Sequence, residues 1–337
     1  MDIYLAPLEG LTDYTFRNSY EQVYGKGKIA KYFTPFISPN SSENFLTKEM
    51  RDVDRDNNKG LYVVPQVMTN NSKDFIWTIK KLHKELGYEE INLNLGCPSG
   101  TVVSKKKGSG FLGDIEGLDK FLYETMSDKY VQDNNIKISL KTRIGLDTAS
   151  NWEEIIGVYN KYKLEEIIVH PRIRTDFYKN EVNKEAFKYA LRMSTNKVVY
   201  NGDIFTRRDY LDFLTEFKEC DAIMLGRGLV ADPALINVLK AEDPVNYVRD
   251  LQKDKEQLSK FHEKVLNERL KIMSGDKHAI HRMKEMWCYM EYVFDDKKDV
   301  KQVKKSQKME EYKLAVKVLL NNTNIVEKEH ISFWKKH

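Results

Sequence analysis

The sequence predicts a (β/α)₈ barrel followed by a C-terminal bundle of helices. Short apolar segments rich in β-branched residues recur through the first two-thirds of the 337-residue chain, separated by amphipathic segments. A barrel of this type takes about 250 residues, which leaves a tail long enough for a helical domain. After residue 245 the strand-like apolar segments no longer recur, and long stretches with helical periodicity follow.

Eight segments are predicted as strands. Most of them begin about 25–40 residues apart, which is the spacing of repeated strand–helix units with a parallel sheet. In chain order they are Ile3–Ala6, Ile29–Thr34, Leu61–Val67, Glu90–Leu95, Ile136–Thr142, Glu166–His170, Lys197–Asn201 and Ala222–Leu225. A doubly wound open sheet has similar spacing, but eight strands alternating with helices favour the closed barrel.

Capping signals predict where several helices begin. Asn151 is followed by two glutamates, which favour the first turn of a helix. Thr206 and Asp209 form a capping-box variant with Asp in place of Glu or Gln. Asp232 before Pro233 predicts an N-cap followed by proline at the first helical position.

Three long amphipathic helices are predicted in the tail. Their apolar residues repeat with a period of 3.6 residues. The helices span Leu251–Met273, Lys277–Phe294 and Val300–Asn321. We therefore expect two domains, a barrel over residues 1–242 and a helical domain over residues 243–337.

Charge is unevenly distributed along the chain. Residues 241–337 hold 21 Lys and Arg against 17 Asp and Glu, whereas the first 240 residues hold 34 of each. A basic excess in one segment suggests that this segment contacts a polyanion. A lysine-rich solvated surface would give the same count, so charge alone leaves both readings open.

Several functional classes are disfavoured by composition. No apolar run approaches the roughly 20 residues of a membrane span, and the first residues read as a strand rather than a signal segment. The three cysteines, Cys97, Cys220 and Cys288, lack metal-ligand spacing and make a disulfide framework unexpected. We therefore expect a cytoplasmic protein without a metal site.

Candidate functional residues follow the predicted strands, because barrel enzymes place their active sites at the C-terminal ends of strands. Asn201-Gly202-Asp203 and Gly226-Arg227-Gly228 follow the last two strands, where barrels frequently bind phosphate. Glycines let backbone N–H groups approach an anion, and arginine adds a bidentate donor. Two ordinary turns would explain the Gly and Asp residues but not Arg227.

Lys141 and Arg143 alternate on one strand, so both should point into the barrel mouth. Two inward cations need an anionic ligand, water or a structural carboxylate. His170 could donate to a phosphate or simply bond the backbone at its strand end. Cys97 precedes a proline turn, and a thiol with a pKa near 8.5 suits a general acid better than a nucleophile. Most free cysteines, in contrast, are inert and buried.

A basic, glycine-containing loop follows the fourth strand. Lys105-Lys106-Lys107 precedes Gly108-Ser109-Gly110, and the spacing matches neither a P-loop nor a dinucleotide fingerprint. The loop could close on an RNA backbone or could be an ordinary solvated loop.

Taken together, these strand-end residues resemble the tRNA-dihydrouridine synthase family. The matching segments appear in the family's order, and they are Ala6–Asp13 with Phe16-Arg17, Asn92–Pro98, Gly108–Gly110, Lys141–Gly145, Asn201–Ile204 and Gly226–Gly228. The helical tail resembles the family's appended domain, with Arg282 and Trp287 on a helix similar to its tRNA-facing one.

The resemblance implies an enzyme that contains FMN and uses NADPH to reduce the C5–C6 double bond of specific tRNA uridines. Hydride would pass from flavin N5 to C6, and Cys97 would protonate C5. The flavin would be bound by Pro7, Leu8, Glu9, Gln66, Lys141, His170, Asn201, Gly202, Asp203, Gly226 and Arg227. The RNA would be bound by Asn94, Lys105, Arg143, Arg172 and Arg282. A monomer without an obligate protein partner is expected.

One segment departs from the family pattern. The family usually reads His-Gly-Arg-Thr after the sixth strand, whereas this chain has His170-Pro171-Arg172-Ile173. Pro171 removes a backbone N–H and Ile173 removes a hydroxyl, so the contacts of this loop should differ.

Three other functions are compatible with parts of the sequence. They are a flavin barrel acting on a small molecule, an acyl-transfer enzyme pairing Cys97 with His170, and a non-catalytic RNA-binding module. The basic tail disfavours the first. The presence of Cys97, Lys141 and Arg143 together disfavours the last.

Overall fold

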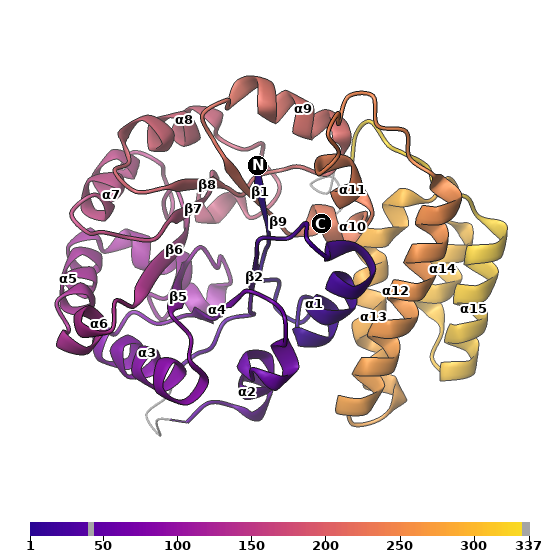
Figure 1. The fold of residues 1–337 in the computed structure, drawn as a ribbon, viewed down its shortest axis with the longest axis horizontal. Helices are drawn as coiled ribbons and strands as arrows, with labels where there is room; N and C mark the ends of the chain where they lie inside the picture. The colour runs from indigo at the N-terminus through magenta and orange to yellow at the C-terminus, as the bar shows by residue number, and fades with distance from the viewer. Residues whose placement is uncertain (40–43, 332–337) are drawn as a thin grey trace.

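The computed structural model describes residues 1–39 and 44–331, so residues 332–337 of the predicted helical domain lie outside the described residues. Parallel strands form one sheet in the order β3-β2-β1-β9-β8-β7-β6-β5-β4. They are β1 (Asp2–Leu5), β2 (Lys31–Phe33), β3 (Val63–Val64), β4 (Gln66–Val67), β5 (Glu90–Leu95), β6 (Lys137–Arg143), β7 (Ile167–His170), β8 (Val198–Tyr200) and β9 (Ala222–Leu225). The sheet curls into a nearly closed barrel surrounded by helices (Figure 1), so the predicted fold class is confirmed.

The predicted strand Leu61–Val67 is in fact two short strands on either side of Pro65. Proline has no N–H and cannot continue a ladder of hydrogen bonds. Its carbonyl accepts from the backbone N–H of Asn92 at 2.9 Å, while the N–H of Gln66 donates to Thr34 Oγ1 at 3.0 Å. Thus β3 pairs with β2 and β4 pairs with β5, and this kinked segment brings the two ends of the sheet together.

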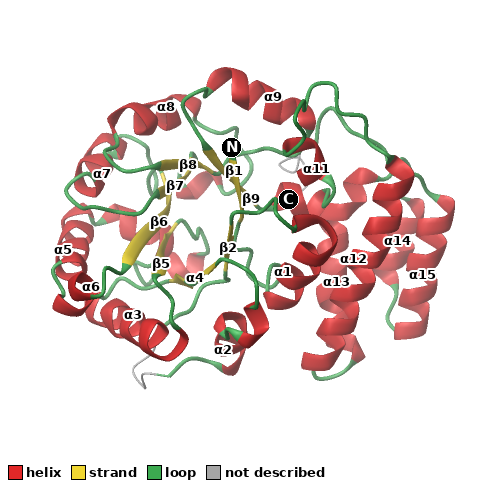
Figure 2. Ribbon diagram, viewed as in Figure 1, coloured by secondary structure: helices red, strands yellow, loops and turns green. Residues whose placement is uncertain are grey.

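Most helices of the barrel region lie around the outside of the barrel (Figure 2). Those of the barrel region are α1 (Tyr14–Tyr20), α2 (Thr47–Val53), α3 (Ser72–Leu86), α4 (Gly100–Val103), α5 (Ile115–Met126), α6 (Lys129–Asp133), α7 (Trp152–Tyr159), α8 (Lys184–Met193), α9 (Arg207–Glu216), α10 (Arg227–Ala231) and α11 (Leu235–Leu239). Successive side chains of β5 point to opposite faces of the sheet, so the strand contributes to packing on both its outer and its inner side. Ile91, Leu93 and Leu95 join the large apolar core, while Asn92 and Asn94 are buried on the other face.

The structure confirms the helix starts predicted at Thr206 and Asn151 and corrects the one predicted at Asp232. Thr206 caps α9, with the N–H of Asp209 donating to Thr206 Oγ1 at 3.1 Å. Asn151 precedes α7 as predicted, although its side chain makes no capping bond. The prediction for Asp232 was wrong, because α11 begins three residues later at Leu235. Both Asp232 oxygens instead accept from Arg249, at 2.5 and 3.1 Å.

The C-terminal region consists of α12 (Leu251–Ile272), α13 (Asp276–Met290), α14 (Lys298–Lys305) and α15 (Met309–Asn322). The third predicted helix, Val300–Asn321, is therefore two helices. The chain turns at Ser306, whose backbone is extended, and α15 then starts afresh. The Glu311 carboxylate accepts from the N–H groups of Gln307 and Lys308 at 3.2 and 3.4 Å, which fixes that new start.

The helical region packs on the barrel beside α1 and α10. The Phe261 ring of α12 meets the rings of Phe16, Tyr20 and Tyr24 at centroid distances of 5.2, 6.0 and 5.7 Å. Such aromatic contacts bury large apolar surfaces and give a specific geometry. Among the described residues, no helix is long and apolar enough to cross a lipid bilayer.

Candidate functional site

Two adjoining cavities open where the barrel strands end. They have empty volumes of about 480 and 620 Å³. Both are lined by a common set of residues, namely Pro7, Leu8, Lys141, His170 and Tyr178. Because these residues lie near or just after the C-terminal ends of β1, β6 and β7, the predicted strand-end site is assembled from segments far apart in the sequence.

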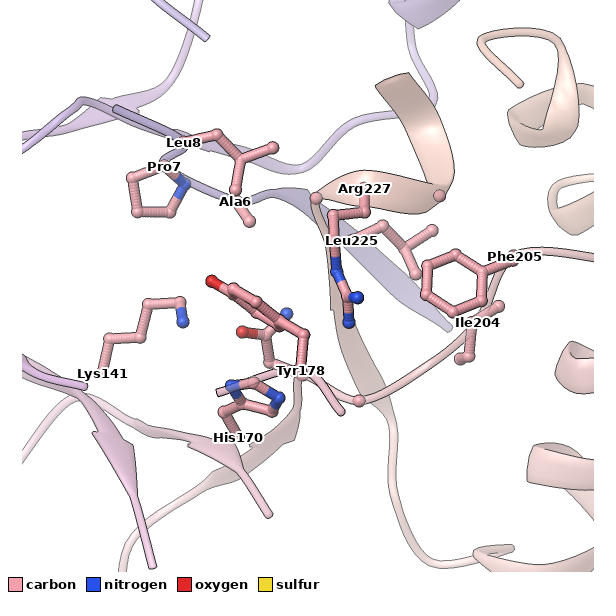
Figure 3. A pocket seen from close by; sticks show the side chains of 14 residues that line it. Ala6, Pro7, Leu8, Lys141, His170, Tyr178, Ile204, Phe205, Leu225 and Arg227 are labelled. Carbon is pink, nitrogen blue, oxygen red and sulfur yellow. The ribbon is translucent and has the colours of Figure 1, made fainter. Parts of the chain in front are cut away.

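The first cavity has walls of small residues beside β8 and β9. Asn201, Gly202, Gly226 and Arg227 line it, as Figure 3 shows for Arg227. A Cβ atom on Gly226 would lie 3.2 Å from that of Ala6, and one on Gly202 would overlap the Tyr200 hydroxyl. Gly226 therefore leaves room beside the cavity residues Ala6 and Leu8, which suits close approach of a ligand to the backbone, whereas Gly202 leaves room for the buried Tyr200 side chain.

Asp203 stands behind this cavity rather than in its wall. Its carboxylate accepts from Arg227 Nη2 at 2.7 Å and from the two terminal nitrogens of Arg172 at 2.9 and 2.5 Å. Charge-assisted bonds of this kind are short and orient both partners. Asp203 thereby holds Arg227 in place at the cavity wall.

Arg172 is fully buried and does not line either cavity. Besides Asp203, it donates to the Asn180 carbonyl at 2.7 Å and meets His170 Nε2 at 3.1 Å. The geometry gives Arg172 a supporting role, in place of the substrate contact expected from the sequence.

His170 lines both cavities but is a poor candidate for a base. Burial, reinforced by neighbouring cations of which Arg143 is the strongest, holds the pKa of His170 well below its ordinary value. Its Nε2 faces the Arg172 guanidinium, which is always a donor, so that nitrogen accepts. The alternative of a Cys97–His170 acyl-transfer pair is therefore not supported.

Lys141 points into the space shared by the two cavities (Figure 3). Burial, with the charge of Arg143 as the next cause, lowers the pKa of Lys141 to about 7. A buried ammonium group is stabilised by an anionic neighbour, so this position favours a ligand with negative charge.

Arg143 also lines the second cavity, but its donors are engaged within the protein. Nε donates to the carbonyl of Gly96 at 3.0 Å, and the terminal nitrogens donate to the carbonyls of Ile173 and Phe177 at 2.7 and 2.8 Å. Arg143 thus ties the loop that carries Cys97 to the loop after β7.

Cys97 lies in the wall of the second cavity, in a turn held by side chains. Asn94 Oδ1 accepts from the N–H groups of Gly96 and Cys97, both at 3.0 Å. The Cys97 carbonyl accepts from the N–H and hydroxyl of Ser109 at 3.1 and 2.8 Å. Burial raises the pKa of the Cys97 thiol, so it remains protonated at neutral pH, as a general acid requires.

A chain of amides orients Asn94 from inside the barrel. Asn94 Nδ2 donates to Gln66 Oε1 at 2.7 Å, and Gln66 Nε2 donates to Asn92 Oδ1 at 2.8 Å. Asn92 in turn donates to Ser139 Oγ at 3.0 Å. Both Gln66 and Asn94 line the second cavity while also bracing the turn of Cys97.

Of the remaining predicted residues, Glu9, Lys105 and Arg282, only Glu9 lines one of the two cavities. Glu9 lines the second cavity and forms an ion pair with Lys48 of α2. Lys105 is exposed on the basic loop. Arg282 is partly exposed, pairs with Glu285 at 2.8 Å and covers Gly10. Trp287, on the same helix as Arg282, is fully buried and donates to the Tyr312 hydroxyl at 2.8 Å.

Tyr178 lines both cavities and was missed by the sequence analysis. Its ring stacks on His170 at 5.9 Å, and the guanidinium carbon of Arg227 lies 4.3 Å from the ring centroid. Figure 3 shows the ring projecting into the cavity. It follows Phe177, which has a φ of 49°, so the loop bends sharply just before it. No periodicity marks a loop residue of this kind; an aromatic shortly after a strand end was the only signal.

Comparison with known proteins matches this chain to one protein family, to several relatives and to solved structures. The family described as dihydrouridine synthase matches residues 4–324. A tRNA-dihydrouridine(16) synthase of Pseudomonas putida is 30% identical over 256 residues, covering 73% of this chain and 76% of that protein. One from Neisseria meningitidis is 24% identical over 295 residues, covering 87% and 86%. Among solved structures, morphinone reductase shares the fold, with a TM-score of 0.51, 10% identity and coverage of 77% of this chain and 88% of that one.

Proposed function

Because this chain belongs to the dihydrouridine synthase family, we propose that it reduces specific uridines in tRNA to 5,6-dihydrouridine, with FMN as bound cofactor and NADPH as reductant. Family membership supports the reaction, and the names of the relatives support tRNA as substrate. The observation that carries the proposal is the joining of Cys97, Lys141 and Arg227 around two connected cavities, since these residues come from three separate family motifs.

The cavities have properties that suit FMN. Their empty volumes fall in the range of roughly 300–1,000 Å³ typical of cofactor pockets. Arg227 is presented by Asp203 beside Gly202 and Gly226, which favours a phosphate at that end. Pro7 and Leu8 offer apolar contact in the part shared by both cavities, where Lys141 offers a cation. Tyr178 would have to turn aside for an elongated ligand to extend through both.

The proposed chemistry divides between cofactor and protein. FMN reduced by NADPH would supply the hydride for C6 of the uracil ring. The Cys97 thiol, kept protonated by burial, donates its proton to C5, and the thiolate that remains regains a proton from solvent. Lys141 stabilises negative charge in the shared part of the cavities. Asn94 braces the Cys97 turn and faces the second cavity, where we place the uracil.

The substrate base must leave the folded RNA to reach this cavity. Unstacking costs a few kcal/mol, which contacts to the RNA backbone must offset. We place those contacts on Lys105 and Arg282 at the mouth, and on a helical tRNA-binding domain over residues 243–337 beside a catalytic barrel over residues 1–242. The three free cysteines fit the reducing cytoplasm that we propose as its location.

An absorption spectrum of the purified protein, followed by anaerobic addition of NADPH, tests the cofactor assignment. We expect flavin absorption bands that bleach on addition of NADPH. A matched variant, Arg227→Met, should lose FMN during purification while keeping its fold, because one phosphate ligand is removed. A colourless protein that FMN cannot reconstitute would refute the assignment.

A further inference from the structure

Arg269 of α12 is a fully buried arginine at the junction of the helical region and the barrel. Its Nη2 donates to the carbonyl of Leu11 at 2.8 Å, and its Nη1 donates to the carbonyl of Arg282 in α13 at 3.1 Å. Nε lies 3.8 Å from Asp13 Oδ2. One guanidinium therefore joins two helices of the tail to the segment between β1 and α1.

The segment it contacts forms one wall of the candidate active site. The Leu8 carbonyl accepts from the N–H groups of Leu11 and Thr12, both at 3.0 Å. Thr12 Oγ1 accepts from the Leu8 N–H at 2.7 Å and donates to the Ala6 carbonyl at 3.1 Å. These bonds fold residues 6–13 into a closed turn, with Pro7 and Leu8 lining both cavities.

Two arginines hold this turn by consecutive carbonyl groups. Arg17 of α1 donates to the Thr12 carbonyl at 2.9 Å, while Arg269 holds that of Leu11. Arg17 belongs to the barrel, and its other bonds reach the Asp52 carbonyl and Asn58. Arg269 is the member of the pair that comes from the helical region, so it is a candidate link between the RNA-facing part and the cavity wall.

A second contact from the same region supports this link. The Arg282 side chain of α13 lies directly over Gly10, which has a φ of 77°. A Cβ on Gly10 would overlap Arg282 Nη1, so this glycine provides both the backbone conformation and the space. Helices α12 and α13 thus contact neighbouring residues of the same turn, and both lie next to the barrel in Figure 1.

We propose that Arg269 is a positioning residue through which the helical region fixes the Pro7–Leu8 wall of the active site. The significance of the wall for flavin binding rests on the function proposed above, but the contact itself does not. A buried guanidinium bonded to carbonyls of two separate segments allows one relative arrangement, because each carbonyl left without a donor would be costly. A displacement of the helical region on binding RNA would therefore be transmitted to the Pro7–Leu8 wall.

Hydrogen–deuterium exchange of residues 6–13 tests the proposal without flavin or RNA. The variant is Arg269→Met, and the matched control is Arg249→Met. Arg249 is also a buried arginine of the junction, paired with Asp232 at 2.5 Å and Asp254 at 2.8 Å, but it makes no contact with the turn among its described bonds. Both variants should melt at a lower temperature than the parent protein.

The exchange rates should then separate the two variants. The N–H groups of Leu11 and Thr12 should exchange about tenfold faster or more in Arg269→Met and at the parent rate in Arg249→Met, since hydrogen bonds to charged groups contribute about 1.5–3 kcal/mol. Equal protection of the turn in Arg269→Met and the parent, or equal loss in both variants, would overturn the proposal. If Arg269→Met does not fold, Arg269→Lys replaces it, and protection of the turn at the parent level would again overturn the proposal.

A second readout connects the contact to the cofactor. In Arg269→Met, the affinity for added FMN should fall several-fold and the flavin absorption band should change shape, whereas Arg249→Met should retain both. A parent protein that binds no FMN would refute the proposed function but leave the exchange result standing. Faster exchange in Arg269→Met with parental FMN affinity and spectrum would overturn the link to the flavin wall.

Discussion

Replacing Lys141 by methionine should abolish a specific pH dependence of FMN binding. Burial lowers the pKa of Lys141 to about 7, so the ammonium form loses its proton as pH rises through neutrality. An anionic ligand favours the ammonium form, so above pH 7 binding requires the uptake of a proton. The dissociation constant should therefore rise with pH, by about 15-fold between pH 7 and pH 8.5 when one protonation is linked to binding.

The neighbouring groups do not titrate in the same interval. The pKa of Cys97 is raised by burial and that of His170 is held well below its ordinary value, while Arg143 and Arg227 stay charged. A phosphate monoester has its second pKa near about 6, so the ligand is largely dianionic throughout. Lys141 is thus the group whose charge changes.

Fluorescence titration of the flavin-free protein with FMN at several pH values measures this dependence. In Lys141→Met the affinity should be weaker at pH 7 and nearly constant up to pH 8.5. Calorimetry in two buffers of different ionisation enthalpy should detect proton uptake by the parent protein and none by the variant. A flat profile for the parent protein, or the same slope in both proteins, would refute the role given to Lys141.

Three further predictions follow from the same site. In Cys97→Ala, formation of dihydrouridine should fall by roughly 10²–10⁴-fold while flavin content and bleaching by NADPH remain, as stopped-flow absorbance would show; loss of bleaching would contradict a role confined to the proton. In Asp203→Asn, the free energy of unfolding measured in urea should fall by about 3 kcal/mol, because two buried arginines lose a charged partner, and an unchanged value would contradict that structural role. Affinity for tRNA should decrease with salt, and Lys105→Ala and Arg282→Ala should each reduce the slope of log K against log salt by about one. The control is Lys188→Ala on helix α8, which should leave this slope unchanged. An equal effect of Lys188→Ala would show that the RNA contacts are not confined to Lys105 and Arg282.

The barrel could be predicted from sequence because its signals are local. Each strand is a short apolar run, and each run is repeated at a similar spacing. The departures came from backbone effects that such runs do not reveal. Pro65 divides one apolar run into β3 and β4, which pair with different strands of the sheet. The Glu311 side chain caps the start of α15, so a new helix begins within a continuous helical pattern.

Many residues that line the two cavities could also be singled out from the sequence, but the bonds of their side chains could not. Pattern alone places Arg143 and Arg172 near the strand ends, yet their donors are bound by carbonyls and carboxylates of loops whose paths the sequence does not specify. Trp287 illustrates the same difficulty, because a shift of one position along a helix changes whether a side chain faces solvent or the core, and that of Trp287 is fully buried. Tyr178 was missed because its place depends on a sharp bend at Phe177.

The most direct test of the proposed function is mass spectrometry of nucleosides from tRNA incubated with the purified protein, FMN and NADPH. Unmodified tRNA from cells unable to form dihydrouridine is the substrate, with Cys97→Ala as the matched control. The expected result is dihydrouridine in the tRNA treated with the parent protein, and little or none with the variant in the same time. No dihydrouridine with a flavin-loaded parent protein, or equal amounts with both proteins, would contradict the assignment of this cavity and of Cys97 to uridine reduction.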